Sequence, residues 1–262
     1  MGNWLLNLPV FAMALIVLGG TYLISAGIYW AVLRLAVGDR ARAFKAVSPG
    51  MLPPLGILFA LLVGFIAVEV WNNFDKAKLA VATEASALRA VVLLAENFPD
   101  EQKKRIYAQV DRHIEESINN EWPAMAHGRA TLSTLRANAL IDALQDVLSL
   151  KPADDSQRAS QPEVVNALEK AMDARRQRIV VSQSSVGTVK WAGLILQAIC
   201  TLIAIAMVHS DNRLACGIAL GLFATGVALS LLLIAAYSRP FTGEISIKPD
   251  LLRQVVTSGA SP

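Results

Sequence analysis

Four long apolar runs, with one polar region between the second and the third, dominate the hydropathy pattern of the chain. They cover residues 10–33, 55–71, 191–208 and 214–237. As a helix, the first run is about 36 Å long, enough to cross a hydrocarbon core of about 30 Å. We therefore predict four transmembrane helices in two pairs.

The ends of these runs carry recognisable signals. Pro53 and Pro54 precede the second run and suit the first turn of a helix, where proline loses no hydrogen bond. The short polar connection at 209–213 predicts an antiparallel hairpin of the last two spans. The first run has a cleaved signal peptide as its alternative, but no Lys or Arg precedes it and it exceeds the usual h-region of about 7–15 residues. This favours a retained helix.

Residues 72–190 change to the periodicity of amphipathic helices, without the alternation typical of strands. No Gly or Pro occurs from Phe65 to Phe98, so the second span is predicted to continue into this region as one rod. The last helix of the region is predicted to run on toward the third span. The apolar positions at helical spacing are Ile106, Val110, Ile114 and Ile118, then Leu132, Leu135, Ala139 and Leu144, then Val165, Leu168, Met172 and Ile179.

Local breaks divide the polar region. Pro99-Asp100 predicts a turn and a helix start, Trp122-Pro123 a break, and residues 151–162 a polar loop. The predicted fold is all-α, a polytopic membrane protein with transmembrane helices in 1–71 and 191–238. These flank a helical cytoplasmic domain at 72–190, and a C-terminal tail follows at 239–262.

Composition supports lipid as the solvent. The chain is 54% hydrophobic and 17% charged, against roughly 45–50% and 25% in soluble domains. The net charge of +3 comes from scattered Lys and Arg, which fits anionic headgroups and does not indicate nucleic acid. Cys200 and Cys216 lack metal or redox spacing and are predicted to be buried free thiols.

Basic residues near the span ends indicate the orientation. An even number of spans puts both termini and the central domain on one side. Counting only the Lys and Arg near the span ends, that side holds ten and the opposite side five. The positive-inside rule then predicts a cytoplasmic domain, in a bacterium at the inner membrane. The basic stretch at 40–45 argues for the reverse.

The search for catalytic or metal-binding sets finds none. His113, His127 and His209 have no partner at i+3 or i+4, and no HExxH motif, nucleophile elbow or phosphate loop occurs. We expect no enzyme activity, no cofactor and no bound metal, and we treat the histidines as incidental.

Glu69, one turn inside the end of the second span, is the most informative polar residue. A charge within a span usually faces protein or water. The same face carries three apolar residues before it, Phe65, Leu62 and Leu58. Beyond it come the polar residues Asn72, Asn73 and Asp75, which we expect at the end of a pore. Several copies around an axis would form an apolar constriction above a carboxylate-lined vestibule. In the alternative, Glu69 pairs with an Arg or Lys of another helix.

Glu84 and Arg89 follow in the continuation of the same helix. They are five residues apart and poorly placed to pair with each other, so we expect either to contact another helix.

Residues 61–77 and 84–89 resemble a bacterial bestrophin-like membrane protein family, a domain of unknown function. Residues 239–244, just after the last span, strengthen this resemblance, which covers nearly the whole chain. Residues 71–75 (Trp-Asn-Asn-Phe-Asp) are also similar to the Trp-Asn-Gln-Tyr/Phe-Glu run that ends the pore helix of bestrophins.

That second similarity implies a pentameric anion channel whose second span lines the pore, with three apolar neck residues one turn apart. Aligning on Trp71 puts these at Pro54, Leu58 and Leu62. Proline departs from the branched or aromatic neck residue, so Phe65 is the better third member. No acidic calcium clasp follows the last span, and Glu69 would repel anions, which leaves selectivity between anions and cations open.

Two functions follow as hypotheses. The first is an oligomeric, pentameric ion channel in the lipid bilayer that conducts inorganic ions through copies of the second span. The second is a non-conducting membrane scaffold or sensor whose helical domain binds a partner.

Overall fold

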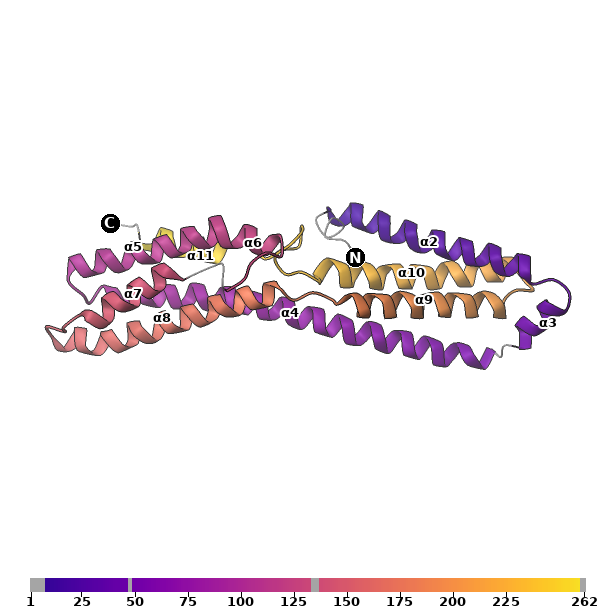
Figure 1. Ribbon diagram of the computed structural model, residues 1–262, viewed down its shortest axis with the longest axis horizontal. Coiled ribbons are helices and arrows are strands. Elements are labelled where there is room, and N and C mark those ends of the chain that lie inside the picture. The colour runs from indigo at the N-terminus through magenta and orange to yellow at the C-terminus, as the bar shows by residue number, and fades with distance from the viewer. Residues whose placement is uncertain (1–7, 47–48, 133–136, 260–262) are drawn as a thin grey trace. The chain divides into compact units, whose positions relative to one another are not determined.

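The structure is a computed structural model that describes residues 8–46, 49–132 and 137–259 (Figure 1). The chain forms two compact units, the first from Met1–Asn72 and Ser185–Ser238 and the second from Asn73–Ser184 and Arg239–Pro262. Helix α4 (Leu52–Ala95) contributes to both. The described part of the chain contains helices and no strand, so the all-α prediction is confirmed.

The first unit holds four helices long and apolar enough to cross a membrane. They are α2 (Val10–Leu35), the first part of α4, α9 (Thr188–Val208) and α10 (Arg213–Tyr237). Helix α3 (Asp39–Ala46) and a 3₁₀ turn, Pro49–Met51, connect α2 to α4. The prediction of four spans in a two-plus-two order is confirmed.

Apolar side chains from all four spans pack in this unit. Phe59, Ile66 and Val70 of α4 lie against residues of α2, α9 and α10. Helices α9 and α10 run side by side as the predicted hairpin (Figure 1), and the Asn212 side chain caps α10 by accepting from the Ala215 N–H at 3.1 Å. Cys216 is buried as predicted. Cys200 is exposed, so that prediction is wrong for it, because its side of α9 faces away from the packed helices.

The second unit surrounds the rest of α4 with shorter helices. These are α5 (Asp100–Glu116), a π-helical turn η2 (Ser117–Glu121), α6 (Trp122–Ala126), α7 (Asn138–Ser149), α8 (Asp155–Ser182) and α11 (Asp250–Gly259). Ile106, Val110 and Ile114 are buried as the periodicity predicts, and so are Leu168 and Ile179.

Two predicted helix limits are confirmed. Helix α4 continues without interruption to Ala95, and α5 begins at Asp100, directly after Pro99.

Four local predictions are wrong. Leu132 lies outside a helix and α7 begins only at Asn138, while Leu135 lies outside the described residues. The predicted break at Trp122 is a helix: Pro123 lies in the first turn of α6, directly after the π-helical turn η2. Helix α8 ends at Ser182 and does not run on into α9.

The predicted polar loop at 151–162 is helical from Asp155. The Asp154 carboxylate caps this helix by accepting from the Gln157 N–H at 2.7 Å. Polar side chains here have polar partners: Asn97 donates to Ser160 Oγ at 2.8 Å, and Gln161 donates to the carbonyl of Val147 at 2.7 Å. The polar pattern therefore reflects contacts between helices, not a loop.

Candidate functional site

The first part of α4 leaves most of its apolar surface uncovered in the protomer. Within the most apolar stretch of 18 residues in each span, only 17% is buried in α4, against 22% in α2 and 39% in each of α9 and α10. Phe59, Ile66 and Val70 form the buried side of the helix. The predicted constriction lies beside it: Leu58 and Phe65 are 56% and 72% exposed, and Leu62 is half-buried.

Glu69 forms an ion pair with Lys190 of α9. Both carboxylate oxygens accept from the Lys190 ammonium at 2.5 Å, and the two side chains are 42% and 46% exposed. The alternative stated for Glu69, pairing with a basic residue of another helix, is thus present in the structure. The pair carries no net charge, so the argument that a lone Glu69 repels anions no longer applies.

The polar residues after the second span lie at the end of the apolar part of α4. Asn72 and Asp75 are exposed and Asn73 is half-buried. Gln197 of α9 donates to the Leu55 carbonyl at 3.3 Å, near the start of the span. Polar contacts from α9 therefore reach α4 near both ends of its apolar run.

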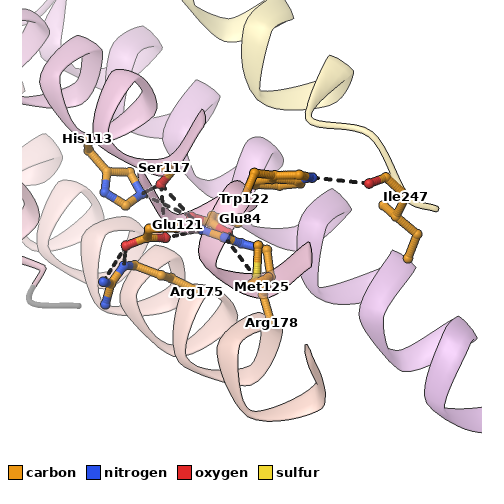
Figure 2. A network of polar contacts seen from close by, with 9 residues as sticks. All are labelled: Glu84, His113, Ser117, Glu121, Trp122, Met125, Arg175, Arg178 and Ile247. Carbon is orange, nitrogen blue, oxygen red and sulfur yellow. Dashed lines mark hydrogen bonds and ion pairs between the residues drawn. The ribbon is translucent and has the colours of Figure 1, made fainter. Parts of the chain in front are cut away.

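A buried ionic network occupies the second unit (Figure 2). Arg178 of α8 is fully buried and makes a two-point contact with Glu84 of α4: its Nε and Nη2 donate to the two carboxylate oxygens at 2.7 and 2.9 Å. The same guanidinium donates to Glu121 of η2 at 2.8 Å. The expectation that Glu84 contacts another helix is confirmed. Arg89 is exposed.

Three further groups complete this network. His113 Nε2 lies 3.0 Å from Glu84 Oε1, and because an ionised carboxylate only accepts, we assign the proton to Nε2. Arg175 donates to Glu121 Oε1 at 2.8 Å, and Ser117 donates to its other oxygen at 3.3 Å. Two guanidinium groups therefore balance two carboxylates, as a buried set of charges requires.

Aromatic contacts close one side of the network. The Arg178 guanidinium lies 4.5 Å from the centre of the Trp122 ring. The Trp122 indole donates to the Ile247 carbonyl at 3.1 Å (Figure 2). Its ring also packs edge-on against Phe241. The C-terminal segment therefore contributes directly to the core of this unit.

The network controls the ionisation of Glu84. Burial raises the pKa of this carboxyl, but the Arg178 charge and the hydrogen bonds from His113 and Arg178 together outweigh burial and lower the pKa from 4.5 to about 2. Arg178 remains charged because the Coulomb attraction of Glu84 and Glu121 outweighs its own burial. The arrangement is a rigid connection of α4, α5, η2 and α8.

The interpretation of His113 as incidental is wrong, and Glu121 and Arg178 were missed. A signal exists: His113, Ser117 and Glu121 recur every four residues and continue the face of α5 that carries Ile106 and Val110. Charged and polar residues on an otherwise buried helix face indicate partners from another helix. Their partner on α8 is 57 residues from Glu121 in sequence and carries no local signal.

Comparison with known proteins gives a family for this arrangement. The Bestrophin-like domain profile matches residues 19–252, which is most of the chain. The chain belongs to the Bestrophin-like family. No curated protein matches this bestrophin-like chain significantly.

Solved structures share its fold. Two single-substitution variants of a bacterial bestrophin homologue from Klebsiella pneumoniae are similar, one with 15% identity and a TM-score of 0.69 over 93% of this chain and 96% of the other. The second has 14% identity and a TM-score of 0.70 over 95% and 99%. At this identity the bestrophin-like protein shares the polytopic fold with them.

Proposed function

We propose that this bestrophin-like protein is an oligomeric, pentameric ion channel with α4 around the axis. The observation that carries the proposal is the uncovered surface of α4: only 17% of its most apolar stretch of 18 residues is buried in the protomer. A helix that carries Glu69 near the end of its span fits a protein-lined axis better than lipid. Membership of the Bestrophin-like family and the likeness to bacterial bestrophin homologues support it.

In this proposal Leu58, Leu62 and Phe65 form the constriction. Two of the three are exposed in the protomer, as a pore-lining side chain must be. Glu69 and Lys190 together present a neutral but polar pair below the constriction, with Asn72, Asn73 and Asp75 at the pore end. Each pair presents one ammonium and one carboxylate group in the proposed ring, so both anions and cations find an oppositely charged partner there.

Recording of single-channel currents from purified protein in planar bilayers tests the proposal. Replacing the apolar ring residues in a Leu58→Ala/Phe65→Ala variant should raise conductance, because smaller side chains widen and wet the constriction. Leu23→Ala is the matched control, since Leu23 of α2 is 76% exposed and in this proposal faces lipid. Absence of current, or equal conductance in all three proteins, would overturn the assignment.

We further propose that the second unit is cytoplasmic and that the membrane is the bacterial inner membrane. The excess of Lys and Arg on the side of this unit supports that orientation. Labelling of a Ser86→Cys variant, exposed on α4, with a membrane-impermeant maleimide checks it. No labelling in intact spheroplasts and full labelling after lysis is the expected result.

A further inference from the structure

Two adjoining cavities form a continuous groove along α2 and α10 in the first unit. The larger has a volume of about 500 Å³ and the smaller about 250 Å³. They share Tyr29 and Gly217 and so adjoin one another. Their other principal lining residues are Tyr22, Ser25, Gly221 and Arg213.

The groove exists because two residues of α10 beside α2, Gly217 and Gly221, carry no side chain. A Cβ atom on Gly217 would lie 3.9 Å from the Tyr29 ring, and one on Gly221 would meet nothing within 4 Å. These glycines therefore leave space open and do not bring the helices into contact. Deeper in the span the groove ends where Tyr22 and Thr225 share a hydrogen bond of 2.6 Å.

Ser25 provides a buried polar group inside this groove. The residue is only 5% exposed and lines the smaller cavity, and no hydrogen bond joins its hydroxyl to another described residue. Thr21, one turn earlier, satisfies its own hydroxyl by donating to the Val17 carbonyl at 2.7 Å. A hydroxyl that lines a cavity without a protein partner is a ready donor for an acceptor that enters the groove.

The open end of the groove is positively charged. Arg213 is the first residue of α10, is exposed, and forms no ion pair with another described residue. The Tyr29 hydroxyl lies 3.5 Å from the Arg213 carbonyl oxygen. Tyrosine and tryptophan mark the headgroup depth of a membrane, and Trp30 follows directly. Arg213 therefore lies where lipid phosphates lie.

The length of the groove fits one lipid leaflet. From Arg213 to Thr225 the helix rises about 18 Å, slightly more than half of a hydrocarbon core of about 30 Å. We propose that the groove binds one anionic glycerophospholipid per protomer. The phosphate contacts the Arg213 guanidinium, an ester carbonyl accepts from Ser25, and one acyl chain lies along Gly217 and Gly221.

Native mass spectrometry of the full-length protein, delipidated in detergent and then titrated with phosphatidylglycerol, tests this site. We expect one tightly retained phosphatidylglycerol per protomer, and weaker retention of phosphatidylcholine with the same acyl chains. Arg213→Gln should lower the affinity for phosphatidylglycerol about tenfold or more, because a charge-assisted contact is lost. Ser25→Ala should lower it by a smaller factor.

Gly221→Leu should abolish retention, because the new side chain fills the groove without a clash. Gly19→Leu is the matched control: Gly19 of α2 also has nothing within 4 Å of its Cβ position, and it does not line the groove. Arg34→Gln, at the end of α2, controls for the loss of one positive charge. Both control variants should retain the lipid.

Three results would overturn the site. The first is equal retention of phosphatidylglycerol by Gly221→Leu and Gly19→Leu. The second is displacement of the lipid by inorganic phosphate at millimolar concentration, which would indicate a free-anion site. The third is a change in oligomeric mass on Gly221→Leu with lipid retention unaltered, which would indicate that a second copy of the chain fills the groove.

Discussion

At the scale of single residues, the Glu69–Lys190 ion pair determines the charge that the second span would present in the proposed pore. The two charges are 2.5 Å apart and each side chain is nearly half exposed. Water and ions therefore reach both groups, and their attraction stabilises the fold by at most about 1 kcal/mol. The pair is better suited to setting a local potential than to holding the helices together.

Removing one member of this pair should move ion selectivity in a defined direction. Lys190→Gln leaves the Glu69 carboxylate alone and should favour cations, while Glu69→Gln leaves the ammonium alone and should favour anions. Reversal potentials in a salt gradient measure both shifts, which should have opposite signs. The double variant is the control and should return close to the original protein; shifts of the same sign in the single variants would refute this account.

Arg178 has a structural role that its exposed neighbour Arg176 lacks. Arg178→Met leaves Glu84 and Glu121 buried beside a neutral side chain, which should lower the free energy of unfolding by about 3–5 kcal/mol. Arg176→Met, on the exposed side of α8, should change it by less than about 1 kcal/mol. Chemical unfolding in detergent measures both, and equal losses would exclude the network as the cause.

Glu84 also predicts a pH dependence. Its pKa is lowered from 4.5 to about 2 in the folded protein, so its contribution to stability is complete above pH 4.5 and is lost as the pH falls toward 2. We expect the melting temperature of the original protein to fall more steeply over this window than that of Glu84→Gln. Thermal unfolding followed by circular dichroism at a series of pH values gives the comparison, and parallel slopes would contradict it.

At the scale of elements, α11 is part of the core of the second unit. Leu252 and Val255 are 0% and 1% exposed and pack in the same cluster as Val110 and Leu168. Ile247, just before α11, accepts the Trp122 indole hydrogen bond. This packing does not show in hydropathy, because the segment is short and lies far in sequence from its partners.

Shortening the side chain of Leu252 should therefore destabilise the protein. Leu252→Ala is expected to lower the free energy of unfolding by about 2–5 kcal/mol, as for a large buried side chain. Leu251→Ala, at the adjacent and 40% exposed position, should have a small effect. Urea unfolding of both variants in the same detergent distinguishes them, and a small loss for Leu252→Ala would show that α11 detaches readily.

Much of the element order was predictable because it depends on local pattern. Long apolar runs identified the four spans, and the absence of Gly and Pro identified the continuous α4. The start of α8 was missed because its capping Asp and its polar first residues resemble a loop when only the sequence is considered. The helices that provide their hydrogen-bond partners are not visible in that pattern. A contact of Glu84 with another helix was expected, but its partner Arg178 was missed because it lies 94 residues away, and pairing at that distance is decided by packing alone.

At the scale of the whole molecule, the proposed ring requires α4 to meet other copies in both units. In the second unit, Leu79 and Leu93 of α4 are 65% and 66% exposed. They are two heptads apart and so lie on one face. If the second unit lies outside the membrane, as proposed, large apolar side chains on one face of it indicate a contact with another protein surface.

Mass photometry in detergent should accordingly give the mass of five protomers. A Leu79→Asp/Leu93→Asp variant should shift the mass toward the monomer, because charges replace apolar contacts at the proposed interface. Leu148→Asp on α7, 61% exposed in the protomer, is the control and should leave the mass unchanged. A monomeric or dimeric original protein would remove the axial pore from consideration.

Helix α4 carries both Glu69 and Glu84, and the ribosome therefore makes both carboxylates before their basic partners. Lys190 follows Glu69 by 121 residues and Arg178 follows Glu84 by 94. At translation rates of about 5–20 residues per second, each carboxylate therefore waits roughly 5–25 seconds for its partner. Glu69 is therefore synthesised as a temporarily unpaired acid, and its ion pair forms only once the first turn of α9 has been made.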